Sequence, residues 1–141
     1  MTSFIVDTGP LVALLNRRDQ HHGWAKSILA ELPPPLLTCE PVLAEICHIL
    51  RASAGGPEAT LTMVHRGLLD VSFRLADHAA EIGRLLRRYA SVPMSLADAC
   101  LVRLAELRRD CTVLTLDADF RIYRRHGRGV IPILTAPGRG P

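Results

Sequence analysis

The 141-residue sequence has little lysine, few aromatic residues and no long apolar run, and each shortage excludes a class of protein. Lys26 is the only lysine among 17 basic residues, so the other bases are arginines, whose planar guanidinium suits phosphate binding. Codon bias in a GC-rich genome would produce the same excess. Only 4% of residues are aromatic, which argues against an extended platform for stacking nucleic-acid bases. No apolar run approaches the roughly 20 residues that cross a bilayer, so we expect no membrane association.

The cysteines have neither metal-type nor disulfide-type spacing. Cys39, Cys47, Cys100 and Cys111 lie in apolar stretches without a C-x-x-C pair, which is typical of reduced core thiols in a cytosolic protein. Met1–Ser3 do not begin a signal-type segment, so we expect a cytoplasmic protein. The composition is 48% hydrophobic and 22% charged, as in one ordinary globular domain, and the net charge of +3 does not by itself establish a polyanionic partner.

Strand and helix patterns alternate along the chain. Apolar runs predict strands over residues 3–7, 36–38, 69–73, 111–115 and 130–134. Helical patterns cover residues 8–15, 22–32, 41–52, 58–66, 77–89, 96–109 and, briefly, 118–125. This alternation predicts an α/β fold in which helices cover both faces of a parallel sheet. The domain is predicted to span residues 1–135, followed by a flexible tail over 136–141 that is rich in glycine and proline.

Four acidic residues occupy positions that point to a shared site. Asp7 ends the first predicted strand and Asp117 follows the fourth, so both belong at the carboxyl edge of the sheet if these strands are neighbours. Glu45 borders the apolar stripe of its helix, and Asp98 lies within the apolar face of another helix, one turn from its start. Acids that converge beside a core repel each other unless a cation lies between them. The pattern therefore predicts a divalent metal site.

Each acid also has a structural explanation. Asp7 can form an Asx turn before a helix, and Asp117 can be the N-cap of the short helix that follows it. Ser95 and Asp98 have the spacing of a capping box, and Glu45 can be solvated at the edge of its stripe. Because these explanations are independent of one another, we regard all four holding together as the less favoured interpretation.

The segments around these acids resemble those of PIN-domain ribonucleases, and most closely VapC-type toxins of toxin–antitoxin pairs. The matching segments are Phe4–Thr8, Pro41–Ile46, Ser95–Ala99 and Thr115–Phe120. Their order and spacing match the family over nearly the whole chain. The resemblance implies a three-layer α/β/α fold with a central parallel sheet of about five strands. It also implies metal-dependent endonucleolytic cleavage of RNA (tRNA, rRNA or mRNA), a cognate antitoxin protein and a homodimer.

The resemblance also assigns roles to individual residues. It implies a catalytic quartet made of Asp7, Glu45, Asp98 and Asp117. Among these, Asp7, Asp98 and Asp117 would bind Mg²⁺ or Mn²⁺, hard cations that carboxylate oxygens suit. Further positions match groups that support the quartet, namely Thr8, Thr115 and Asp119.

Arginines flank the predicted site and are candidates for contacts with RNA phosphates. Arg17 follows the first helix, whereas Arg121, Arg124 and Arg125 follow Asp117 closely. Guanidinium groups in such places would bind phosphates on either side of the cleaved bond. A solvated helix face explains any single one of these arginines equally well.

Three other interpretations were weighed. Phosphotransfer through Asp7 is disfavoured, because a haloacid-dehalogenase-like site needs an acid where Gly9 stands and a receiver-type domain needs a late lysine. Glu45 and His48 supply one Glu-x-x-His, whereas di-iron bundles need two. A non-catalytic PIN-like module that binds RNA or a partner stays open, and metal titration would separate it from a nuclease.

Overall fold

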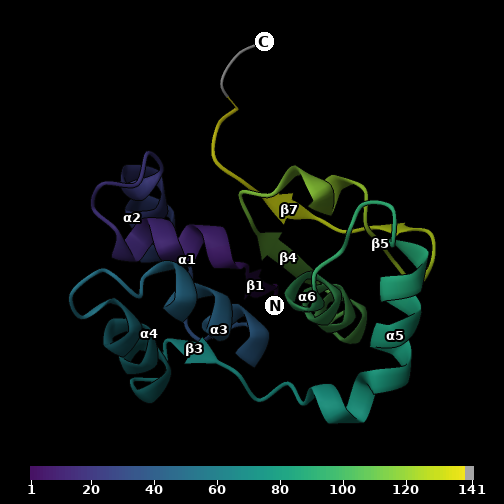
Figure 1. Cartoon of the computed structure of the whole chain (residues 1–141). Coiled ribbons are helices and arrows are strands. Elements are labelled where there is room, and N and C mark those ends of the chain that lie inside the picture. Colours follow the sequence, from purple (N-terminus) through teal and green to yellow (C-terminus); the bar gives the residue numbers. More distant parts are fainter. Residues whose placement is uncertain (139–141) are drawn as a thin grey trace.

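The computed structural model describes residues 1–138, and its centre is a five-stranded parallel sheet (Figure 1). The order of the strands in the sheet is β3-β2-β1-β4-β7. Their bounds are Ser3–Val6 for β1, Leu36–Leu37 for β2, Leu69–Asp70 for β3, Cys111–Leu114 for β4 and Ile133–Leu134 for β7. Every neighbouring pair in this sheet is parallel. The α/β class predicted from the alternating patterns is therefore confirmed.

Helices connect the strands and cover both faces of the sheet. They are α1 (Thr8–Leu15), α2 (His22–Glu31), α3 (Glu40–Ile49), α4 (Gly56–His65), α5 (Ala79–Arg88) and α6 (Leu96–Leu107). Helices α1 to α4 gather on one side of the sheet, and α5 and α6 on the other (Figure 1). Right-handed crossovers explain this division, because the chain moves outward from β1 to β3 and then returns to the other side of β1. The result is the predicted three-layer α/β/α arrangement.

The chain adds β2 and β3 on one side of β1 and then adds β4 and β7 on the other side. The strand β1 is therefore the point at which the direction of strand addition changes. In open parallel sheets, the carboxyl edge at such a switch point is the usual place for a binding site. The β1–β4 pairing runs in register from Ser3 and Cys111 to Val6 and Leu114, so both strands end together. The two predicted site segments that follow these strands are thereby brought side by side.

A closely packed apolar core supports the carboxyl edge of the sheet. Ile5 and Val6 of β1 and Val113 and Leu114 of β4 are fully buried, as expected for central strands covered on both faces. Helix α6 contacts both strands with an almost entirely buried apolar face. Because closely packed interiors resist displacement, the residues that follow the two strands have a rigid base.

Several predicted element bounds are wrong. The strand expected over 130–134 is divided into β6 (Gly129–Val130), which pairs antiparallel with β5 (Arg124–Arg125), and β7. The helix expected over 118–125 is the shorter 3₁₀ helix η2 (Ala118–Arg121), and the helix expected from residue 77 begins as the 3₁₀ helix η1 (Leu75–His78). Positive φ angles at His126 and Gly127 turn the chain sharply between β5 and β6. That turn pairs Gly129 and Val130 with β5, and only Ile133 and Leu134 of the predicted strand pair with β4.

The predicted tail falls partly within the structure. Ala136 is buried, whereas residues 139–141 lie outside the described residues. The domain boundary at residue 135 and the flexibility of 136–141 stay predictions. Within residues 1–138, no helix combines the length and apolar character needed to cross a membrane.

Candidate active site

A chain of hydrogen bonds joins the residues that follow β1 and β4. Asp7, only 6% exposed, accepts a hydrogen bond from the Thr8 N–H on Oδ1 (2.7 Å) and one from the Thr115 hydroxyl on Oδ2 (2.8 Å). The fully buried Thr115 hydroxyl also accepts from the backbone N–H of Asp117 at 2.9 Å. Thr115 therefore links the two acids that the sequence places at the ends of neighbouring strands.

Thr8 extends the same chain to helix α3. Its hydroxyl donates to Oε2 of Glu45 at 2.8 Å, while its N–H binds Asp7. Glu45 is half-buried, on the side of α3 that packs near α1. The structure thus connects Glu45, Asp7 and Asp117 through two threonines.

Asp98 reaches this edge from the first turn of α6 and is 8% exposed. The Tyr123 hydroxyl donates to its Oδ2 at 2.8 Å. The Asp98 backbone N–H donates to the Ser95 hydroxyl at 3.0 Å. The predicted helix cap is therefore present, and it does not prevent Asp98 from lying beside the other acids. The sequence analysis missed Tyr123, although a buried phenol that needs a hydrogen-bond partner is a usable signal in a chain with two tyrosines.

Burial and mutual repulsion change the acidity of these groups. Burial raises the pKa of Asp7 from 3.8 to about 6, and the nearby carboxylates of Asp98 and Asp117 add to the rise against the hydrogen bonds from Thr8 and Thr115. Burial also raises the pKa of Asp98; the hydrogen bond from the Tyr123 hydroxyl opposes the rise, and Asp117 adds to it. Asp7, Asp98 and Asp117 therefore share one region of negative potential.

Asp117 and Asp119 shape the start of η2. Asp117 is exposed, and its Oδ1 accepts from the Asp119 N–H at 2.8 Å, so the expected N-cap is present. Asp119 is half-buried, and its carbonyl accepts from the backbone N–H of Ile122 and Tyr123. The cap fixes Asp117 just beyond the carboxyl end of β4.

Gly9 lets α1 begin close to the end of β4. A Cβ at this position would lie 3.2 Å from the Leu116 Cβ, tighter than almost all real contacts. A side chain here would push the first turn of α1 away from the residue that precedes Asp117. The sequence analysis used Gly9 only to exclude phosphotransfer chemistry and missed this packing role.

The candidate RNA-binding arginines divide into two kinds. Nη1 of Arg124 donates to the Arg121, Ile122 and Tyr123 carbonyls, and Nη1 of Arg125 donates to carbonyls at the end of α6. These two guanidinium groups hold the chain that follows η2. Arg17 and Arg121 are exposed, and in the described part of the chain no hydrogen bond or ion pair holds either guanidinium.

The carboxylate groups at this edge of the sheet are chemically suited to bind a hard divalent cation. Carboxylate oxygens are the ligands that Mg²⁺ and Mn²⁺ prefer, and a cation would relieve the repulsion among Asp7, Asp98 and Asp117. Across residues 1–138, however, no three histidine, cysteine or acidic side chains are arranged as a ready set of metal ligands. The four cysteines are free thiols.

Comparisons with known proteins agree with this fold. The PIN domain family model matches residues 4–125. Ribonuclease VapC26 of Mycobacterium tuberculosis is 31% identical over 133 residues, which cover 92% of this chain and 93% of the relative. The chain therefore belongs to the PIN-domain family. Within that family it is of the VapC type, as the resemblance implied.

Solved structures give the same assignment. The crystal structure of M. tuberculosis VapC20, a toxin that cleaves the sarcin–ricin loop, is 27% identical with a TM-score of 0.75 and covers 83% of this chain and 92% of its own. DNA-bound VapBC of Salmonella typhimurium is 18% identical with a TM-score of 0.57, and covers 96% of this chain and 98% of its own. At that lower identity, the likeness concerns the fold alone.

Proposed function

We propose that this chain is a metal-dependent endoribonuclease that hydrolyses RNA phosphodiester bonds, and the toxin of a type II toxin–antitoxin pair. The VapC-type relatives support the class of reaction. The observation that carries the proposal is the chain of hydrogen bonds from Glu45 through Thr8, Asp7 and Thr115 to Asp117 at the switch point. Buried acids in such a network need a cationic partner, which metal-assisted hydrolysis provides.

Asp7, Asp98 and Asp117 would hold Mg²⁺ or Mn²⁺. When bound, such a cation lowers the pKa of a coordinated water and stabilises negative charge on phosphoryl oxygens. The hydrogen bonds from Thr115 and Tyr123 orient the Asp7 and Asp98 carboxylates, and each carboxylate keeps lone pairs for a cation. Each ligand would thus be preoriented before the cation arrives.

Glu45 would complete the quartet from the other side of Asp7. Thr8 holds one of its oxygens, Oε2, and the half-buried side chain keeps access to water. A carboxylate in this place can accept a hydrogen bond from an attacking water and align it with the phosphorus. Its part in the reaction is therefore to position the nucleophile.

The direct test is incubation of the purified protein with tRNA and rRNA, with Mg²⁺ or with EDTA. We expect specific fragments only in the presence of the metal. Asp98→Asn is the matched variant, because its amide oxygen can still accept the hydrogen bond from Tyr123 while the negative charge is lost. A folded Asp98→Asn protein that cleaves as fast as the natural sequence would refute the assignment.

A protein partner forms part of the proposal. The structural relatives include VapBC complexes of S. typhimurium and of Rickettsia felis, the latter with a TM-score of 0.62 and 12% identity over 96% of this chain. An apolar groove of about 390 Å³ between α2 and α4, lined among others by Leu29, Leu32 and Met63, fits an amphipathic helix of an antitoxin. Coexpression with the protein encoded by the neighbouring gene should yield a stable complex that loses its nuclease activity.

The remaining parts of the proposal are a homodimer and a cytosolic location. The four free thiols support a reducing compartment. Light scattering of the purified toxin measures its mass directly, and a value of about 31 kDa, twice the 15.5 kDa chain, is expected. A monomer at all concentrations would contradict the dimer without affecting the nuclease assignment.

A non-catalytic PIN-like module that binds RNA or a partner is the second candidate. Such a module would need no cluster of metal ligands, and none is arranged in advance within residues 1–138. Such a module would bind RNA equally well with Mg²⁺ and with EDTA, and would leave the RNA intact. The cleavage assay above therefore separates the two candidates.

A further inference from the structure

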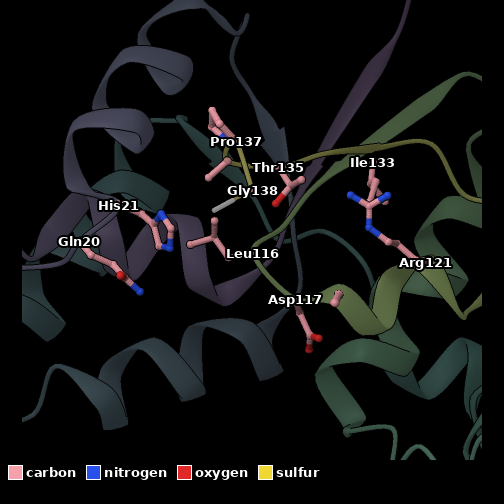
Figure 2. Close-up of a pocket in the computed structure, with 11 residues that line it drawn as sticks. Gln20, His21, Leu116, Asp117, Arg121, Ile133, Thr135, Pro137 and Gly138 are labelled. Carbon is pink, nitrogen blue, oxygen red and sulfur yellow. The ribbon is translucent and has the colours of Figure 1, made fainter. Parts of the chain in front are cut away.

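A pocket of about 390 Å³ opens beside Asp117 (Figure 2). Its walls come from the loop between α1 and α2, from the start of η2 and from the chain that leaves β7. None of the hydrogen bonds that hold the acidic residues uses this space. It is large enough for a small organic ligand, since ligand pockets begin at about 300 Å³.

Two polar side chains of the pocket, Arg121 and His21, are available for a ligand. Figure 2 shows His21 on one side of the space and Arg121 on the other, with Leu116 between them. Arg121 is exposed and His21 is half-buried. Throughout residues 1–138, no hydrogen bond or ion pair holds the Arg121 guanidinium or the His21 ring. Their only contacts of this kind run through the main chain.

The remaining wall is apolar. Leu116 and Ile133 are half-buried, and Pro137 closes the far side (Figure 2). Leu116 lies close to Gly9, where α1 begins. A flat aromatic ring can lie against such a wall even though the pocket contains no aromatic residue.

We propose that this pocket is a subsite for one unstacked ribonucleotide directly next to the cleaved phosphodiester. The inference rests on the proposed nuclease function, because Asp117 joins the pocket to the acidic site. Arg121 binds the phosphate of this nucleotide through its planar guanidinium. The base lies against Leu116 and Ile133, and His21 donates a hydrogen bond to its edge or to the ribose.

This combination of groups favours a nucleotide over other ligands. An apolar wall beside an unpaired guanidinium matches a base joined to a phosphate, whereas a free phosphate would leave the wall without a partner. An acidic peptide would also pair with the guanidinium, but it brings no flat ring to cover the apolar wall formed by Leu116 and Ile133. The subsite would restrict which nucleotide stands beside the cleavage point, and so contribute to sequence preference.

The first experiment measures nucleotide binding without any cleavage. Methyl-labelled protein is titrated with each ribonucleoside 5′-monophosphate and, in parallel, with ribose 5-phosphate. We expect saturable shifts of the Leu116 and Ile133 methyl signals with at least one nucleotide and much smaller shifts with ribose 5-phosphate. Arg121→Ala should weaken binding about tenfold. Arg66→Ala removes the same charge from the exposed end of α4 and should bind as the natural sequence does.

The second experiment measures cleavage of RNA in Mg²⁺. Arg121→Ala is expected to raise KM about tenfold with kcat nearly unchanged, because it removes substrate binding and not an acidic ligand. Arg66→Ala should leave both constants unchanged. If the natural protein cleaves RNA but Arg121→Ala behaves identically, the subsite is wrong and the nuclease stands. If the natural protein cleaves no RNA, the nuclease is wrong, and the nucleotide titration alone decides the pocket; no shift at Leu116 and Ile133 overturns it.

Discussion

The acids at the carboxyl edge of the sheet and the arginines at and after the end of η2 differ in how firmly the fold holds them. Asp7 and Asp98 are buried, and each accepts a hydrogen bond from another side chain. Of the arginines, Arg124 and Arg125 are bound to main-chain carbonyls, whereas Arg121 is held by none of the described residues. The buried acids are thus held by donors before any ligand binds, whereas the Arg121 guanidinium is not held by the described residues.

This difference has an energetic cause. Bringing carboxylates together in a dry environment is unfavourable, so the fold stabilises them with donors such as Thr115 and Tyr123. An arginine on the surface costs little to leave unbound, since water solvates its guanidinium. Substitutions in the acidic cluster should therefore affect activity far more than substitutions among the arginines.

The largest effect is expected for Asp7→Asn. Loss of one charged ligand should lower kcat/KM for RNA cleavage at least about 10³-fold, or roughly 4 kcal/mol. Because the burial of a charged carboxylate is unfavourable, the variant should be at least as stable at pH 7 as the natural protein. Cleavage kinetics and urea unfolding measure the two quantities. Full activity, or a large loss of stability, would contradict the role given to Asp7.

The next effect is a dependence of stability on pH. The pKa of Asp7 rises from 3.8 in the unfolded chain to about 6 in the folded protein. Between these two pH values the folded protein keeps a proton on Asp7 that the unfolded chain has already lost. Below pH 3.8 both states are protonated and the group contributes nothing. As the pH increases from 3.8 to 6, the folded state progressively loses about 3 kcal/mol of stability relative to Asp7→Asn, and above pH 6 the loss is nearly complete. Urea unfolding of both proteins at pH 4, 5, 6 and 7 gives this difference directly.

Mg²⁺ provides the control for that measurement. A cation bound to the ionised acids should recover part of the lost stability of the natural protein at pH 7 and leave Asp7→Asn unchanged. Equal stability differences at pH 4 and pH 7 would show that burial does not penalise the Asp7 charge.

A smaller effect is expected for Thr115→Val. The substitution preserves the shape of the side chain, but it removes the donor to Asp7 and the acceptor for the Asp117 N–H. Loss of such an orienting partner should reduce metal affinity or activity about 10- to 100-fold. Thr112→Val is a matched control, because Thr112 lies half-buried in β4, shortly before Thr115, and outside the acidic network. Equal activity of the two variants would show that Thr115 does not orient the acids.

The smallest effect separates the two kinds of arginine. Arg125→Ala should lower the free energy of unfolding by about 1 to 2 kcal/mol, since its guanidinium binds carbonyls at the end of α6. Arg121→Ala should change it by less than about 0.5 kcal/mol. Thermal or urea unfolding measures both, and the reverse order would mean that the division of the arginines is wrong.

Much of the fold was predictable because its signals are local. Asp7 follows a short apolar strand and precedes a helix that begins with Thr8, Gly9 and Pro10, and this combination indicates where β1 ends and α1 starts. The positions of Thr8 and Thr115 beside the acids came from the family resemblance. The structure adds that both hydroxyls donate to carboxylates of the quartet.

The rest depended on contacts between distant segments. Tyr123 binds Asp98 across 25 positions of the sequence, and no local pattern near either residue reveals the pair. The turn at His126 and Gly127 that creates β5 and β6 rests on positive φ angles, which residue identity suggests only weakly for histidine. Which arginines are free was equally hidden, because Arg125 is bound by the end of a helix that precedes it by some 16 to 20 residues.

The most direct test of the central claim is calorimetric titration of the natural protein and of Asp7→Asn with Mn²⁺. If Asp7, Asp98 and Asp117 form one cation site, the natural protein should show saturable binding that the variant loses. If the natural protein takes up no Mn²⁺, or if both proteins bind it equally, these acids do not form a metal site.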